Sequence, residues 1–213
     1  MVAATQSRCS LMLVVEATDG ARQQLEAALA AGTIASACIL PAAGRPYDAP
    51  TLRPLLGTAQ KAGTAALLVD DARLARTLKA DGVHLSADQA AASYEEARDI
   101  LGRGSIVGAD AGRSRDAAMH LGEAGADYIG FGVPDFVTDR QAARARRLEL
   151  VQWWAEIFEV PCVAFDVDNA EDAEALARAG ADFVAVRLSA SLAPADTRDT
   201  TLGMLTALEL GDA

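Results

Sequence analysis

The sequence predicts a single α/β domain over residues 1–213, folded as a (β/α)8 TIM barrel after a flexible segment at residues 1–10. Short apolar runs alternate with helix-forming segments eight times, which is the pattern of strands joined by helical crossovers. The runs are continuously apolar, as expected of parallel strands covered on both faces. Eight such units in about 200 residues fit a small closed barrel.

Internal similarity supports the repeated unit. Gly122–Gly132 (GEAGADYIGFG) resembles Ala177–Arg187 (ARAGADFVAVR), and Lys79–Leu85 (KADGVHL) is a third variant. In the first two, a helix ends at Gly, and Ala-Asp leads into the next strand. A doubly wound open sheet is the alternative fold. It would more often carry a glycine fingerprint after the first strand, where this chain reads EATDGA with one glycine.

The segment Ala65–Leu85 contains one complete unit, in which two apolar runs flank an amphipathic stretch of helix length. A second strand reached through a helix predicts parallel pairing, because an antiparallel partner needs only a tight turn. The expected strands, in order, are Leu11–Val15, Ala35–Leu40, Ala65–Val69, Gly82–Leu85, Ser105–Ala109, Asp127–Gly132, Pro161–Phe165 and Phe183–Leu188.

Helix boundaries are predicted from capping residues and breakers. Asp19 is the expected N-cap of the first helix, and Ser93 and Glu96 have the spacing of a capping box. Pro41–Pro50 is expected to be a loop, and Val133–Arg147 a long connection. The expected helices are Ala21–Ala31, Thr51–Ala62, Ala72–Lys79, Ser93–Leu101, Ser114–Glu123, Leu148–Phe158, Ala170–Ala179 and Thr200–Leu210.

Composition and charge exclude several classes of function. Hydrophobic residues make up 51% of the chain and charged residues 23%, which is typical of a globular protein. The net charge of -11 argues against a nucleic-acid partner, since such proteins need a basic stripe. Cys9, Cys38 and Cys162 are widely spaced and form no CxxC pair, so reduced thiols are expected and a zinc site is not.

No apolar run approaches the roughly 18 residues of a membrane span. The polar N-terminus leads into an apolar run too short for a signal peptide, so no membrane partner and a cytoplasmic location are expected. Trp153 and Trp154 are adjacent and face different sides of a helix. One is expected to pack on the barrel and the other at a subunit contact, which would make the protein a homo-oligomer.

Acidic residues gather where the predicted strands end, which is where barrels carry their sites. Asp70 and Asp71 follow one strand and could hold Mg2+ or cap the next helix. Arg45, Arg113, Arg140 and Arg187 are the clear cations there, too few for two phosphorylated substrates unless metal ions intervene. The acids at the strand ends are Glu16, Asp19, Asp70, Asp71, Asp88, Asp110, Asp135, Asp166 and Asp168.

Three further features allow two interpretations each. His84 lies within a predicted strand and is either a hydrogen-bonded core residue, the favoured interpretation, or a general base. The basic run Arg140–Arg147 is either a loop that closes on an anion or a helix start paired with surface acids. Asp168 or Asn169 is expected to cap a helix, whereas Asp166 is expected to face the strand ends.

The segments LLVDDARLARTLKADGVHLSADQ, SIVGAD, AGADYIGFG, VPCVAFD and AGADFVAV resemble thiamine phosphate synthase and its thiazole-tautomerase relatives. The resemblance covers most of the chain and implies a TIM barrel. For an active synthase it implies that a pyrimidine pyrophosphate is joined to a thiazole phosphate, with Mg2+ and loss of pyrophosphate.

The resemblance implies roles for single positions. Asp71 matches a metal aspartate, and the second metal carboxylate falls on Gln89, next to Asp88. A loop lysine falls on Arg140, a serine after strand 5 falls on Asp110, and a serine after strand 8 matches Ser189 after a shift of one.

Other family positions have changed. The Gln-x-Arg-x-Lys pattern that grips the pyrophosphate reads Ile39-Leu40-Pro41-Ala42-Ala43. The Gly-Gly pair that holds a phosphate reads Asp166-Val167, and the tautomerase histidine falls on Gly112.

The hypothesis is therefore a divergent member of this family that binds a small molecule at the carboxyl end of the barrel without efficient synthase activity. The alternatives are an active Mg2+-dependent synthase, which would be a transferase, and a non-catalytic regulatory protein of thiamine metabolism. The expected site residues are Arg140 and Asp110 for catalysis, Asp70, His84, Asp166, Arg187 and Ser189 for substrate binding, and Asp71 and Asp88 for the metal.

Overall fold

The computed structural model describes residues 9–133 and 136–211, and it confirms the predicted (β/α)8 barrel. Eight parallel strands pair in chain order, and β8 closes onto β1. The strands are β1 (Ser10–Ala17), β2 (Ser36–Pro41), β3 (Ala65–Val69), β4 (Gly82–Leu85), β5 (Ile106–Asp110), β6 (Tyr128–Phe131), β7 (Cys162–Ala164) and β8 (Phe183–Arg187).

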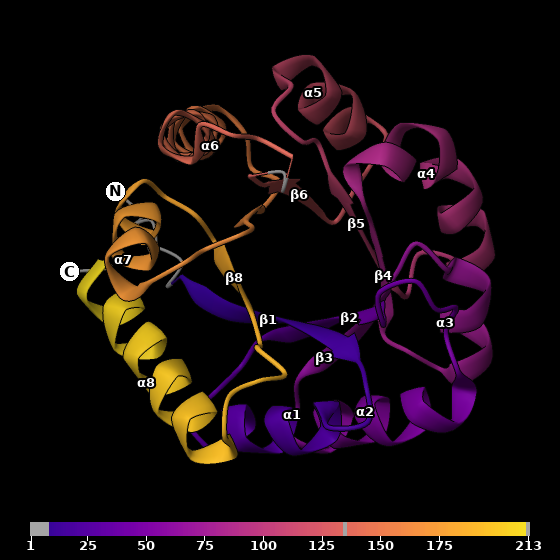
Figure 1. Cartoon of the computed structure of the whole chain (residues 1–213). Helices are drawn as coiled ribbons and strands as arrows, with labels where there is room; N and C mark the ends of the chain where they lie inside the picture. The colour runs from indigo at the N-terminus through magenta and orange to yellow at the C-terminus, as the bar shows by residue number, and fades with distance from the viewer. Residues whose placement is uncertain (1–8, 134–135, 212–213) are drawn as a thin grey trace, which may run out of the picture.

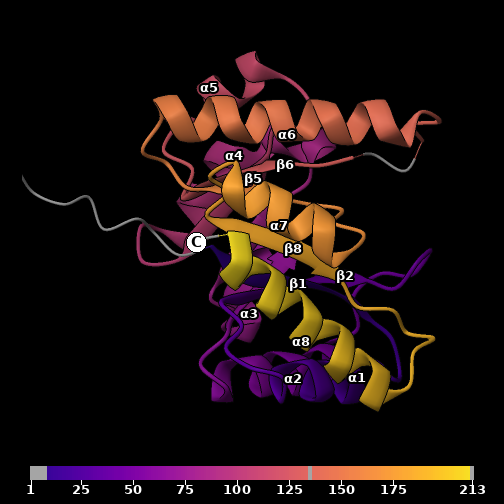
Figure 2. The same cartoon turned by 90° about the vertical axis from the view of Figure 1, so that its left-hand side faces the viewer.

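The helices form a ring around the strands (Figure 1), and α6, α7 and α8 follow one another along one side (Figure 2). Helix α8 packs against both α7 and α1, which completes the ring. The helices are α1 (Ala21–Leu29), α2 (Ala49–Lys61), α3 (Ala72–Leu78), α4 (Ala87–Leu101), α5 (Arg115–Glu123), α6 (Arg140–Ile157), α7 (Ala170–Arg178) and α8 (Pro194–Gly211).

Of the segment 1–10 that was expected to be flexible, residues 1–8 lie outside the described part, and Ser10 already belongs to β1. Asp135 also lies outside the described residues. Within the described ranges, no helix is long and apolar enough to cross a membrane.

Apolar side chains form two clusters, one between the strands and the helices and one inside the barrel. A larger cluster, which includes Leu13, Ile39 and Trp154, lies between the strands and the helices. The interior of the barrel is packed as well, so it is not a pore. Its buried residues are Met12, Val14, Cys38, Leu67, Tyr128, Val163, Phe165 and Ala185.

Several helices begin at a side chain that accepts a hydrogen bond from a backbone N–H of the first turn. Asn169 caps α7 in this way, as one of the two predicted residues. The prediction that Asp19 caps α1 is wrong, because Gly20 takes that position and no side chain makes a capping bond there. The capping side chains are Asp48, Asp71, Ser114, Asp139 and Asn169.

The predicted capping box of Ser93 and Glu96 is wrong, because α4 begins six residues earlier, at Ala87. The alanine-rich stretch before Ser93 favours a helix. Ser86 is the N-cap residue, but its hydroxyl donates to Asp70 across the loop and makes no capping bond.

The basic run Arg140–Arg147 is the first part of α6, not a long connection. Asp139 caps this helix through the N–H of Ala142, and arginine and alanine both favour helix. Helix α8 likewise starts earlier than expected, at Pro194, since proline is well tolerated in a first turn. In α6, Trp154 is buried, while Trp153 is half-buried beneath the Arg115 guanidinium, 4.7 Å from the ring centroid. An oligomer stays a prediction.

Candidate functional site

Asp70 and Asp71 both follow β3, but their carboxylates do different things. Asp70 has a backbone φ of 57°, which is uncommon for a residue other than glycine. Its two carboxylate oxygens accept hydrogen bonds from the backbone N–H and the hydroxyl of Ser86, at 2.8 and 2.7 Å. Asp71 caps α3, because its Oδ1 accepts from Leu74 N at 2.8 Å. Asp71 Oδ2 keeps no hydrogen bond to any described residue.

Asp110 and Asp166 flank the same glycine at the carboxyl end of the barrel. A Cβ atom placed on Gly132 would lie 2.8 Å from Asp166 Oδ2 and 3.7 Å from Asp110 Oδ2. Asp166 Oδ2 accepts a hydrogen bond from Val133 N at 2.8 Å, and Asp110 Oδ1 accepts from Gly112 N at 2.6 Å. The structure therefore brings together two residues that the sequence placed after strands 5 and 7.

The Asp110 carboxyl is buried enough to titrate near neutrality. Burial raises its pKa to about 7, and the negative charges of Asp166, Asp70 and Asp88 add to this against the lowering effect of the Gly112 N–H. Three neighbouring carboxylates thus raise the pKa of Asp110 at the carboxyl end of the barrel.

His84 lies beneath these carboxylates in the packed interior, with 6% of its surface exposed. Its Nδ1 is 2.9 Å from the hydroxyl of Tyr128, and the two rings are nearly parallel. The Phe165 ring lies on it at a centroid distance of 4.7 Å. Burial lowers the pKa of His84 to about 4, so the ring is neutral near pH 7. This arrangement suits a hydrogen-bonded core histidine better than a general base.

Four arginines near the mouth are engaged by the protein itself. Arg187 pairs with Glu16 at 3.0 Å, and Arg144 pairs with Asp168. Arg147 is buried and bonds to the loop after β7, while Arg140 donates to the carbonyl oxygen of Val133 at 3.3 Å. Of the two interpretations of this run, the structure shows the helix start whose arginines pair with acids.

Other predicted residues fall into two separate cavities. Arg187 and Ser189 line a cavity of about 270 Å³ between β1 and β8, with Glu16 and Thr18. Asp70 and Asp71 line a second one, of about 130 Å³, on the side of β3 and β4. The predicted binding residues are thus spread around the mouth.

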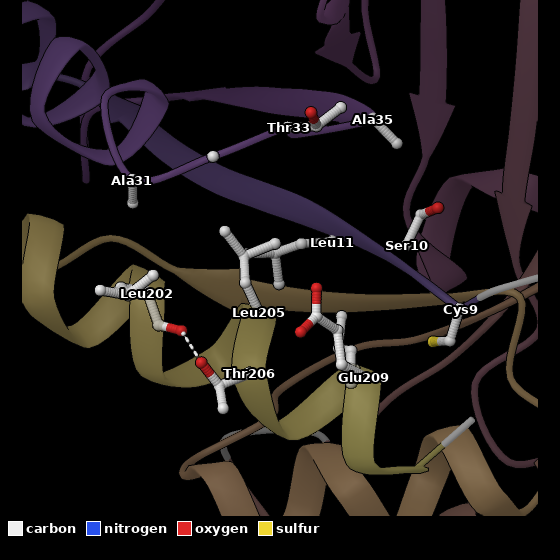
Figure 3. Close-up of a pocket in the computed structure, with 12 residues that line it drawn as sticks. Cys9, Ser10, Leu11, Ala31, Thr33, Ala35, Leu202, Leu205, Thr206 and Glu209 are labelled. Atoms are coloured by element: carbon white, nitrogen blue, oxygen red, sulfur yellow. Dashed lines mark hydrogen bonds between the residues drawn. The ribbon is translucent and has the colours of Figure 1, made fainter. Parts of the chain in front are cut away.

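A third cavity, of about 460 Å³, lies at the amino end of β1 (Figure 3). Leu11 and Leu205 form its apolar wall, and Glu209 of α8 contributes a carboxylate. It holds none of the predicted site residues, and barrel enzymes carry their sites at the opposite end. The carboxylate-rich end is therefore the better candidate.

The sequence and the fold both indicate the family to which this barrel belongs. Residues 11–190 match the sequence profile of thiamine monophosphate synthase. The chain belongs to this family. The thiamine-phosphate synthase of Erythrobacter litoralis is 38% identical over 192 residues, which cover 87% of this chain and 89% of that protein. The one from Rhodospirillum centenum is 39% identical over 171 residues, covering 76% and 78%.

The fold is also that of a solved structure, the thiamine phosphate pyrophosphorylase of Pyrococcus furiosus. It superimposes with a TM-score of 0.76 at 21% identity and covers 99% of this chain and 100% of that one. At this identity the likeness supports the fold. The family resemblance inferred from the DGVHL and GADYIGFG segments is thereby confirmed.

The resemblance to active synthases implies Mg2+, and the oxygen donors at the mouth suit this ion. Asp71 retains Oδ2, and Asp88 is exposed in the first turn of α4. The part of the chain that the structure describes contains no group of three His, Cys, Asp or Glu residues that would hold a metal. Mg2+ needs only one or two carboxylates when a substrate supplies further oxygens. These donors therefore fit a metal shared with substrate better than an all-protein cage.

Two residues that shape the site, Tyr128 and Tyr47, were not singled out from the sequence, and Arg147 was considered only as the end of the basic run. Tyr128 fixes the ring of His84, and Arg147 fixes the loop after β7. The Tyr47 hydroxyl lies 2.7 Å from Ile39 O and accepts from Val69 N at 2.9 Å, which ties together the ends of β2 and β3. Tyr128 stands within the GADYIGFG segment and Arg147 within the basic run, so both had a local signal, whereas Tyr47 had none.

Proposed function

We propose that this family member binds a small molecule at the carboxyl end of its barrel and no longer joins a pyrimidine pyrophosphate to a thiazole phosphate efficiently. The observation that carries the proposal is the pair Asp110 and Asp166 around Gly132. At these positions the resemblance implies a serine and the first glycine of the Gly-Gly pair that holds a phosphate. A carboxylate there repels phosphate and replaces a donor with an acceptor.

Charge elsewhere at the mouth supports the same conclusion. The segment that would supply Gln, Arg and Lys at the end of β2 reads Ile39-Leu40-Pro41-Ala42-Ala43, and none of these residues carries a charge. Arg187 and Arg144 face protein carboxylates at hydrogen-bond distance. Arginine is the preferred partner of phosphate, but it competes poorly for a ligand while it is held by an internal partner.

The test is a synthase assay on the full chain with both phosphorylated substrates and Mg2+. The Erythrobacter litoralis relative, assayed under the same conditions, controls for substrate quality. We expect turnover at least about a hundredfold below that of the relative, as when about 2.7 kcal/mol of transition-state stabilisation is lost. Comparable turnover would overturn the proposal.

An active synthase is the second candidate function. Two observations favour it: no described residue donates a hydrogen bond to Asp71 Oδ2, and the similarity to a protein named a synthase covers 87% of this chain. It requires Mg2+ at Asp71 and Asp88, and an anion contact at Arg140. In that case Asp71→Ala and Arg140→Ala would each abolish turnover, and removal of Mg2+ with a chelator would do the same. If neither substitution matters, this second function is excluded.

A further inference from the structure

The cavity at the amino end of β1 lies opposite the acidic mouth and has a volume of about 460 Å³. Three parts of the chain surround it: the start of β1, the loop between α1 and β2, and the second half of α8 (Figure 3). Common ligand pockets have volumes of roughly 300–1,000 Å³. The cavity is therefore large enough for a small organic molecule.

The wall of the cavity is mainly aliphatic. Leu11 is 1% exposed, Leu208 is 3% exposed, and Leu205 is half-buried. Leu205 reaches the loop after α1, because a Cβ atom on Gly32 would lie only 2.7 Å from Leu205 Cδ1. Leu202 is 46% exposed and extends the apolar wall to the surface. A ligand body that packs on these leucines is removed from water, which favours binding roughly in proportion to the apolar area buried.

Two helix ends give this cavity a negative potential. Helix α1 ends at Leu29, just before Ala31 in the cavity wall, and α8 ends at Gly211, just after Glu209. The carbonyl groups at the end of a helix carry a partial negative charge, which a cation stabilises. Neither of these two helices has a basic residue in its last turn.

Glu209 adds a full negative charge at the same place. Figure 3 shows its carboxylate directed from α8 toward β1. A carboxylate in the last turn of a helix opposes the helix dipole, so a cation beside it is favoured by both. Glu209 is exposed, and contacts of exposed charges are weak enough to exchange with a ligand. Among the described residues that line the cavity, Glu209 carries the single charge.

We propose that this cavity binds a small molecule with an apolar body and one protonated amine. The body packs on Leu11, Leu205 and Leu208, and the ammonium group lies beside Glu209 and the carbonyl groups at the end of α1. The site is separate from the carboxyl end of the barrel, and it does not rest on the function proposed for that end.

Phenethylamine is a suitable probe, because it joins an apolar ring to an ammonium group at neutral pH. Phenethyl alcohol has the same body without the charge, and phenylacetate carries the opposite charge. The full chain, labelled for NMR, is titrated with each probe. We expect the amine to bind at least about fivefold more tightly than the alcohol, and phenylacetate to bind more weakly than both. High salt should weaken binding of the amine and leave that of the alcohol unchanged.

Variants locate the site. Glu209→Gln keeps the size of the side chain and removes its charge, so it should weaken phenethylamine binding about threefold without affecting the alcohol. Asp199→Asn removes the same charge from an exposed position of α8 outside the cavity and should change neither affinity. Ala35→Leu adds bulk to the cavity wall and should weaken the amine and the alcohol alike. Thermal unfolding of each variant verifies the fold.

Three results would overturn the proposal. The first is the absence of phenethylamine binding, and the second is equal affinity for the amine and the alcohol. The third is a titration that shifts the backbone signals of Asp110 and Asp166 and not those of Leu11 and Glu209, because the acidic mouth would then hold the amine. Turnover in the synthase assay bears on the proposed function alone, so either proposal can fail without the other.

Discussion

Arg147 of α6 lies 2.6 Å from both carboxylate oxygens of Asp172 in α7. The other terminal nitrogen of the same guanidinium donates to the carbonyl oxygens of Phe165 and Asp166, at 2.6 and 2.8 Å. The buried Arg147 side chain thus fixes the loop after β7, which carries both Phe165 and Asp166. Arg147 is a positioning residue, since it acts on the site through the backbone of its neighbours.

Arg147→Met should destabilise the protein by about 3–5 kcal/mol, because it leaves the Asp172 carboxylate and two carbonyl groups without their partner. Urea unfolding monitored by circular dichroism measures the change. Arg144→Met is the matched control on the same helix. Its pair with Asp168 is partly exposed, so a loss of about 1 kcal/mol or less is expected. Equal losses in the two variants would contradict the assigned role of Arg147.

Gly108 in β5 leaves room for the ring of Tyr128. A Cβ there would lie 1.9 Å from Tyr128 Cζ, so Gly108→Ala must displace the ring and break its contact with His84. We expect a loss of about 2–3 kcal/mol in unfolding free energy from overpacking. Gly57→Ala in α2 is the control, because no atom lies within 4 Å of its added Cβ. That change should stabilise the protein by about 0.5–1 kcal/mol.

The sequence predicted the barrel and the order of its units because each strand is a continuous apolar run, which a single local pattern encodes. It also predicted that Asp110 and Asp166 follow strands, but not that they share the space around Gly132. That contact joins three segments far apart in the chain. The bond from Ser86 to Asp70 likewise joins two loops that are 16 residues apart in the chain. Bonds between distant loops leave no mark on local sequence.

His84 should remain neutral well below the pH at which an ordinary histidine gains a proton, because burial lowers its pKa to about 4. Proton NMR of the ring signals between pH 5 and 8 tests this, with the His120→Asn variant assigning the signal of the other histidine. The unfolded state binds the proton of His84 more tightly than the folded state does. The stability that neutral His84 contributes is therefore lost as the pH falls from about 6.5 to about 4. A His84 signal with a midpoint near pH 6.5 would contradict the buried arrangement.

Asp110→Asn should make the protein more resistant to unfolding at pH 8 but not at pH 4. The folded state raises the pKa of Asp110 to about 7, so it holds a proton that the unfolded chain has released. The contribution of this carboxyl to stability is complete below the unfolded pKa of about 4 and is lost as the pH rises through about 7. Asparagine has no such dependence.

The difference in unfolding free energy between Asp110→Asn and the unmodified chain should therefore grow by about 2 kcal/mol from pH 4 to pH 8, roughly half of the unscreened value. The measurement is urea unfolding at several pH values with a chelator present. Titration of His84 is common to both proteins and cancels in the difference. Asp116→Asn, at an exposed helix position, supplies the control for a change in net charge. A constant difference across this pH range would mean that Asp110 is ionised throughout, and that the carboxylates around Gly132 do not repel one another in the folded protein.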